Sequence, residues 1–209
     1  MTTPATPATP ATPDELTAAF DADFAAERFR AAAARGADLA LDAVPEALIA
    51  TALRCRLLAG APIDRVIIAA RVALRHVTAP TARALLHAEL AYALARKRTP
   101  ILAATEADAA TAAWPASSLG PAAHGHVALA FDRRDDALAQ FTAATALDAP
   151  YRGWMGLART RYVLGDFAGA AAALDQLGDL PRTRVAALRL RANLEIGRAS
   201  CRERVCYVV

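Results

Sequence analysis

Residues 150–181 read PYRGWMGLARTRYVLGDFAGAAAALDQLGDLP, and this segment is the clearest indication of the fold class. The part before Gly165 and the part after Asp166 are rich in residues of high helix propensity, and neither contains an internal proline. Gly165 and Asp166 interrupt the helical pattern, and Pro181 ends it, because glycine and proline break helices. Two helices joined by so short a turn lie antiparallel. The segment therefore predicts a helical hairpin.

The same pattern occurs once more, 33 residues earlier in the chain. Residues 131–138 align with residues 164–171 across the expected turn, and Phe141 aligns with Leu174 at the same offset. Self-similarity at a period of about 20–50 residues indicates a repeat architecture in which equivalent units stack side by side. We therefore expect at least two successive hairpins of one kind.

This repeat resembles the tetratricopeptide repeat, a helix-turn-helix unit of about 34 residues with a spaced Trp, Leu, Gly, Tyr, Ala, Phe and Pro signature. The matching positions of the clearest unit are Trp154, Leu157, Ala158, Gly165, Ala170, Leu174 and Pro181. Arg161 departs from the pattern at a position that is usually aromatic, and His124 and Gly125 depart from it in the preceding unit. The resemblance implies an all-α fold, a right-handed superhelical stack of antiparallel helix pairs.

The rest of the chain up to residue 194 also reads as helical, because alanine is frequent and no alternating strand pattern occurs. Helix breakers recur at regular intervals, at Pro45, Gly60-Ala61-Pro62, Pro80, Thr99-Pro100, Trp114-Pro115 with Gly120-Pro121, Asp132-Arg133-Arg134 and Pro150. We therefore expect a helical repeat array over residues 14–194, clearest over residues 121–181. Residues 1–13 form a low-complexity Thr/Pro/Ala tract, which predicts a disordered arm.

The C-terminal residues 195–209 differ from the rest of the chain. Residues 195–205 can be encoded by nucleotides that resemble a widely used short-read sequencing adaptor. Two of the three cysteines lie here, at Cys201 and Cys206, and no alanine follows Ala199. We therefore expect a non-native tail that was never selected to fold, on a natural reading frame cut short after Leu194. The alternative is a natural C-terminal tail.

The composition disfavours several classes of protein. The net charge of +3 does not by itself indicate a nucleic-acid-binding protein, although a pI near 9.0 leaves room for a local basic patch. No run of 18 uncharged apolar residues predicts a membrane span, and the N-terminus does not resemble a secretory signal. Cys55 is the only cysteine outside the tail, so we expect no disulfide framework and a cytoplasmic location.

Signatures of catalytic and metal sites are also missing from the sequence. We find no glycine-rich phosphate loop, no Gly-x-Ser-x-Gly elbow and no His-Glu-x-x-His motif. His124 and His126 lie two residues apart, so on a helix they point in different directions and form no metal pair. His87 with Glu89 is too common a combination to indicate chemistry. We therefore expect no enzyme activity, no cofactor and no metal.

Arginines recur on the expected first helices of the repeats. Residues seven apart lie on one face of a helix, and stacking of equivalent helices would align such residues in a stripe. The candidates are Arg152, Arg159, Arg184 and Arg191, with His126 and Arg54 as continuations. The resemblance implies that these helices line a concave groove that binds peptide segments, and guanidinium groups favour carboxylates. The alternative is that the arginines only solvate an outer face.

The sequence thus predicts a non-enzymatic scaffold that binds a protein or peptide partner and binds neither nucleic acid nor membrane. The arginines favour an acidic partner. A second reading makes the chain the N-terminal sensor or scaffold region of a larger regulatory or catalytic protein. In a third reading, the repeats serve self-association.

Overall fold

A computed structural model describes residues 46–148, 151–178 and 187–195, together with residues 15, 18, 19, 22 and 23. The described part contains helices and no strand, as the sequence predicts. The labelled helices are α3 (Glu46–Leu58), α4 (Ile63–Ala73), α5 (Pro80–Arg96), α6 (Pro100–Ala113), α7 (Leu119–Ala130), α8 (Arg134–Thr145), α9 (Tyr151–Val163) and α10 (Phe167–Asp175). Residues 187–195 are also helical. The predicted arm, the tail from residue 196 and Arg184 lie outside the described residues.

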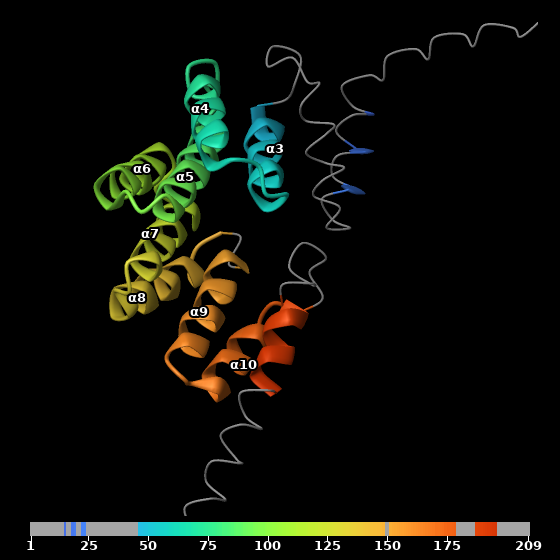
Figure 1. Cartoon of the computed structure of the whole chain (residues 1–209), viewed down its shortest axis with the longest axis vertical. Coiled ribbons are helices and arrows are strands. Elements are labelled where there is room, and N and C mark those ends of the chain that lie inside the picture. Colours follow the sequence, from blue (N-terminus) through green and yellow to red (C-terminus); the bar gives the residue numbers. More distant parts are fainter. Residues whose placement is uncertain are drawn as a thin grey trace, which may run out of the picture.

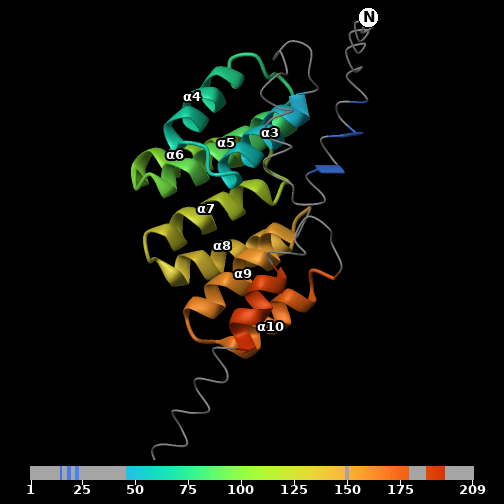
Figure 2. The same cartoon turned by 45° about the vertical axis from the view of Figure 1, so that its right-hand side comes forward.

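The helices form four hairpins that stack in the order of the sequence (Figures 1 and 2). We call α3, α5, α7 and α9 the first helices and α4, α6, α8 and α10 the second helices. Each first helix packs against its own second helix and against the first helix of the next hairpin, and α4, α6 and α8 each pack against the first helix that follows. The chain is thus an all-α, right-handed stack of antiparallel helix pairs, and the predicted fold is confirmed.

Each hairpin turn contains one residue in the left-handed backbone region. These residues are Gly60 (φ 85°), Arg98 (φ 65°), Asp132 (φ 61°) and Gly165 (φ 81°). Glycine adopts this conformation without strain, which explains why Gly60 and Gly165 stand out as helix breakers. After Gly165, the Asp166 carboxylate accepts a hydrogen bond of 2.8 Å from the Gly169 amide and caps α10. The predicted turn is therefore present, and the same turn conformation recurs in all four hairpins.

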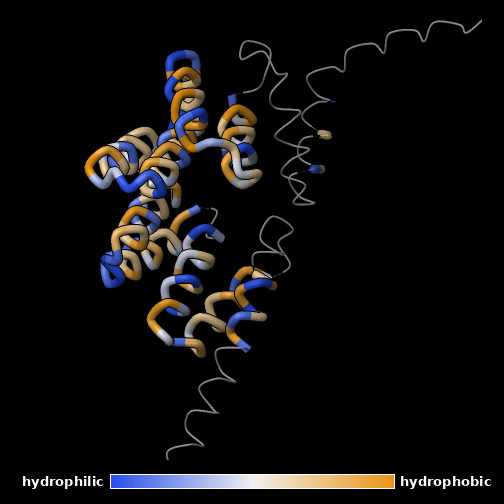
Figure 3. The backbone as a smooth tube through the Cα atoms, in the orientation of Figure 1, coloured by the Kyte–Doolittle hydropathy of each residue, from blue (hydrophilic) through white to orange (hydrophobic). Residues whose placement is uncertain are grey.

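Small residues allow the helices to approach closely. On α6, Ala103, Ala107 and Ala110 are fully buried along one stripe. The Phe141 ring of α8 is also fully buried, and it lies against Gly125 of α7 and Gly156 of α9, where a Cβ atom would come within 2.8 and 2.1 Å of the ring. Hydrophobic and hydrophilic residues are mixed along the helices (Figure 3).

The helix boundaries follow the predicted breakers, with one refinement. Gly120 and Pro121 lie inside the first turn of α7 instead of before it. A proline is tolerated there because its missing amide would have no partner within the helix. A Cβ atom at Gly120 would clash with Thr111, so this glycine serves the contact between α6 and α7.

The helical residues Ala187, Leu190 and Leu194 join the core formed by α8, α9 and α10, which extends the stack beyond the fourth hairpin.

Candidate interaction surface on the first helices

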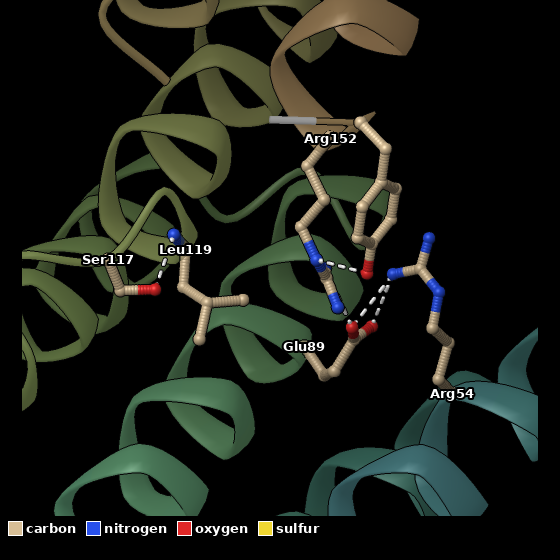
Figure 4. A network of polar contacts seen from close by, with 6 residues as sticks. Arg54, Glu89, Ser117, Leu119 and Arg152 are labelled. Carbon is tan, nitrogen blue, oxygen red and sulfur yellow. Dashed lines mark hydrogen bonds and ion pairs between the residues drawn. The ribbon is translucent and has the colours of Figure 1, made fainter. Parts of the chain in front are cut away.

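A buried carboxylate connects three first helices. Glu89 of α5 is 2% exposed, and its two oxygens accept hydrogen bonds of 2.7 and 2.9 Å from Nη1 of Arg54 on α3. Oε1 also accepts a bond of 3.2 Å from Nη1 of Arg152 on α9 (Figure 4). Arg152 reaches Glu89 although α7 lies between α5 and α9 in the stack, as the order of the helices in Figure 1 shows. The three side chains therefore meet on one side of the first helices. We call this surface the first-helix face.

Glu89 stays ionised despite its burial. Burial by itself would raise the pKa of the carboxyl, but the positive charges and hydrogen bonds of Arg54 and Arg152 outweigh it and lower the pKa below its usual value. The same carboxylate raises the pKa of Arg54. The three groups therefore form a charged network at every physiological pH. A buried charge of this kind is tolerated only because it is fully paired.

Tyr151 supports Arg152 within this network. Nε of Arg152 donates a hydrogen bond of 3.2 Å to the Tyr151 hydroxyl, and the guanidinium carbon lies 5.7 Å from the centre of the tyrosine ring. A ring at this distance attracts a cation through its quadrupole. The hydroxyl and the ring thus hold the Arg152 guanidinium in place, and Figure 4 shows this guanidinium beside Glu89.

His126 of α7 fills the space beside the network. Its ring packs edge-to-face against Tyr92 of α5 at 5.2 Å and against Phe141 of α8 at 5.0 Å between ring centres. Burial, followed by the positive charges of Arg159, Arg54 and Arg152, lowers the pKa of His126 to about 3. The imidazole is therefore neutral at physiological pH and adds no positive charge to the first-helix face.

The arginines singled out from the sequence differ in their surroundings. Arg159 of α9 is exposed and makes no hydrogen bond or ion pair with the described residues, yet its charge acts on His126. Arg54 and Arg152 are held by Glu89. Arg191 instead lies against α10, where it bonds Asp175 at 3.1 Å and the Leu174 carbonyl at 3.5 Å. The structure therefore brings Arg54, His126, Arg152 and Arg159 together.

Sequence reasoning missed Glu89, which organises the face. The sequence alone presents the residue only as a neighbour of His87, whereas His87 lies on a different side of α5 and pairs with Glu106 of α6 at 2.7 Å. A signal was present in the repeat period, because Arg54 and Glu89 lie 35 residues apart, about one repeat. Opposite charges at equivalent positions of neighbouring repeats are brought together by stacking. No comparable signal links Glu89 with Arg152.

Two other histidines, His87 and His124, take part in contacts between neighbouring helices. His124 of α7 lies 3.1 Å from Asp108 of α6, and His87 bridges α5 and α6. Within the described ranges, no group of three or more His, Cys, Asp or Glu residues could hold a metal ion. No helix in the same part of the chain has the length and apolar character needed to cross a membrane.

The arrangement of the hairpins matches a solved structure. The crystal structure of a thermophilic TPR protein from Thermus thermophilus is similar to this chain with a TM-score of 0.70 and 18% sequence identity. The match covers 90% of this chain and 100% of that chain. The fold is that of a tetratricopeptide-repeat solenoid. No protein-family model matches the sequence, and no curated protein matches it. The likeness thus concerns the fold alone.

Proposed function

We propose that the protein is a non-enzymatic binding module that holds an acidic peptide segment of a partner protein on its first-helix face. The observation that carries the proposal is the surplus of positive charge there. Arg54 and Arg152 bond the carboxylate of Glu89, Arg159 adds a third guanidinium whose charge acts on His126, and His126 itself is neutral. A face with more positive than negative charge attracts carboxylates and disfavours basic segments.

Arg159 is the residue best placed to bind such a partner. Its guanidinium is exposed and has no partner among the described residues, so a carboxylate can bind it without displacing an internal contact. Arg54 and Arg152 already bond Glu89, which restricts them to a supporting electrostatic role. A guanidinium offers paired donors that match a carboxylate. The nearby Tyr151 and Tyr92 side chains provide partly exposed rings for the rest of the segment.

Selection from a phage-displayed library of random linear peptides tests this proposal on the full chain. We expect the recovered peptides to be enriched in Asp and Glu, and Arg159→Glu to weaken their binding at least tenfold. Arg133→Glu is the matched control, because Arg133 is exposed in the turn between α7 and α8 and its loss leaves the first helices unchanged. Peptides without acidic residues, or binding that survives Arg159→Glu, would overturn the proposal.

A further inference from the structure

The outward side of α4 carries large aliphatic side chains that no other part of the described chain covers. Ile68 is 62% exposed and Val72 is 36% exposed, although the opposite side of the same helix is buried against α3 and α5. Two such residues one turn apart, in the middle of a solvent-facing helix surface, form a small apolar ridge. Single exposed aliphatic residues are common on protein surfaces, so this ridge does not by itself indicate a binding site. The residues around it decide whether it does.

Three arginines flank this ridge. Arg65, Arg71 and Arg75 are all exposed, and none makes a hydrogen bond or ion pair within the described residues. Most arginines elsewhere in that part of the chain do have partners, as with Arg133 and Asp136 or Arg161 and Asp166. Helical spacing places Arg65, Ile68 and Val72 on successive turns of one face, and Arg75 follows in the turn after α4 ends at Ala73. The outward face of α4 is therefore an apolar ridge flanked by guanidiniums that have no partner among the described residues.

The charge of this face is positive. Asp64 is the only acidic residue of α4, and Lys97 at the end of α5 pairs with it. The exposed His76 follows Arg75 and adds no negative charge. Neither of the helices packed against α4 supplies a carboxylate to Arg65, Arg71 or Arg75: Glu46 of α3 bonds the start of α5, and Glu89 of α5 bonds Arg54 and Arg152. These guanidiniums are therefore available to external carboxylates.

We infer that the outward face of α4 is a second interaction surface, which docks an acidic amphipathic helix of a partner protein. Carboxylates of that helix would pair with Arg65, Arg71 and Arg75, and its aliphatic residues would cover Ile68 and Val72. Arginine is enriched at protein interfaces, where aliphatic residues form the dry centre and charges form the rim. Because α4 is a second helix, this surface is separate from the first-helix face and does not depend on the proposed function.

The geometry favours a helix over an anionic membrane. Binding to a bilayer surface requires a wide apolar face that enters the acyl region, and α4 offers only two aliphatic side chains. A partner helix needs only a ridge that fits between its own side chains, at an interaxial distance of about 8–10 Å.

A display library of two-helix hairpins with one randomised face tests this inference against the full chain. We expect the selected helices to combine Asp or Glu with Leu, Ile or Val on one face. Ile68→Ser and Arg71→Glu should each weaken their binding at least tenfold, whereas Arg133→Glu should leave it unchanged. Both tested positions are on the surface, and circular dichroism verifies that the variants stay folded.

Three results would overturn the inference. The first is a set of selected helices whose binding is unaffected by both Ile68→Ser and Arg71→Glu. The second is a selection that yields no acidic helices. The third is binding to phosphatidylserine vesicles that is lost in the same two variants, because α4 would then recognise a membrane. Arg159→Glu separates the two proposals, since it acts on the first-helix face and leaves α4 intact.

Discussion

Gly156 determines how closely α9 approaches α8. The Phe141 ring fills the space above it and is completely buried, with Gly125 on the other side. A Cβ atom at position 156 would come within 2.1 Å of the ring carbon Cδ1. The ring has little room to withdraw, because Gly125 of α7 packs against its other side, where a Cβ atom would lie 2.8 Å from the ring. Two residues that are unfavourable in isolated helices are therefore required by the packing between repeats.

We predict that Gly156→Ala destabilises the protein by about 1–3 kcal/mol, the usual cost of overpacking, although alanine is the better helix former. Urea denaturation followed by circular dichroism measures the change. In a Phe141→Leu background the same substitution should cost less, because the smaller side chain leaves room for the added methyl group. Equal costs in the two backgrounds would show that the contact with Phe141 is not the cause.

The start of α5 is secured by a residue from another hairpin. The Glu46 carboxylate at the start of α3 accepts hydrogen bonds of 2.7 Å from the Ala79 amide and 3.0 Å from the Thr78 amide. These bonds satisfy amides that have no partner within the helix. The start of α7 is held in a similar way by Asp148, which accepts a bond of 2.7 Å from the Ser118 amide. Glu46 thus connects two neighbouring hairpins, and Asp148 connects the segment after α8 with the start of α7.

The backbone hydrogen bonds from Ala79 and Thr78 lower the pKa of Glu46 below its ordinary value of 4.5. A carboxyl with a lowered folded-state pKa contributes stability above its unfolded pKa and loses that stability as the pH falls through the folded value. We therefore predict that Glu46→Gln lowers the free energy of unfolding at pH 7, and that the difference from the parent shrinks below pH 4.5. Urea denaturation of both proteins at a series of pH values from neutral into the acid range measures this difference in the free energy of unfolding. A difference independent of pH would contradict the assignment.

Across the solenoid as a whole, the network around Glu89 joins the first, second and fourth described hairpins. Its members lie 35 and 63 residues apart in the sequence, and α5 reaches α9 only because the stack curves. Contacts between adjacent hairpins alone would leave that curvature free to vary. The bond between Glu89 and Arg152 therefore links α5 with α9 across the intervening α7.

We predict that Glu89→Ala destabilises the protein by about 3 kcal/mol, because it leaves the guanidiniums of Arg54 and Arg152 uncompensated in a desolvated place. Small-angle scattering should also show a larger radius of gyration in the folded variant. Asp136→Ala is the control, since it breaks the exposed pair with Arg133, and such pairs contribute at most about 1 kcal/mol. Equal effects of the two variants would show that Glu89 has no special role.

The hairpins and their order follow from the amino-acid sequence alone. Turns such as Gly165-Asp166 and the alanine-rich helices are set by local backbone preferences, and the recurrence of the pattern predicts stacking. The clustering of charges required the three-dimensional arrangement. Glu89 meets Arg152 across an intervening hairpin, and Arg191 turns toward α10, because the curvature of the stack and the reach of a long side chain decide which groups meet. The spacing of residues along one helix predicts neither of these two contacts.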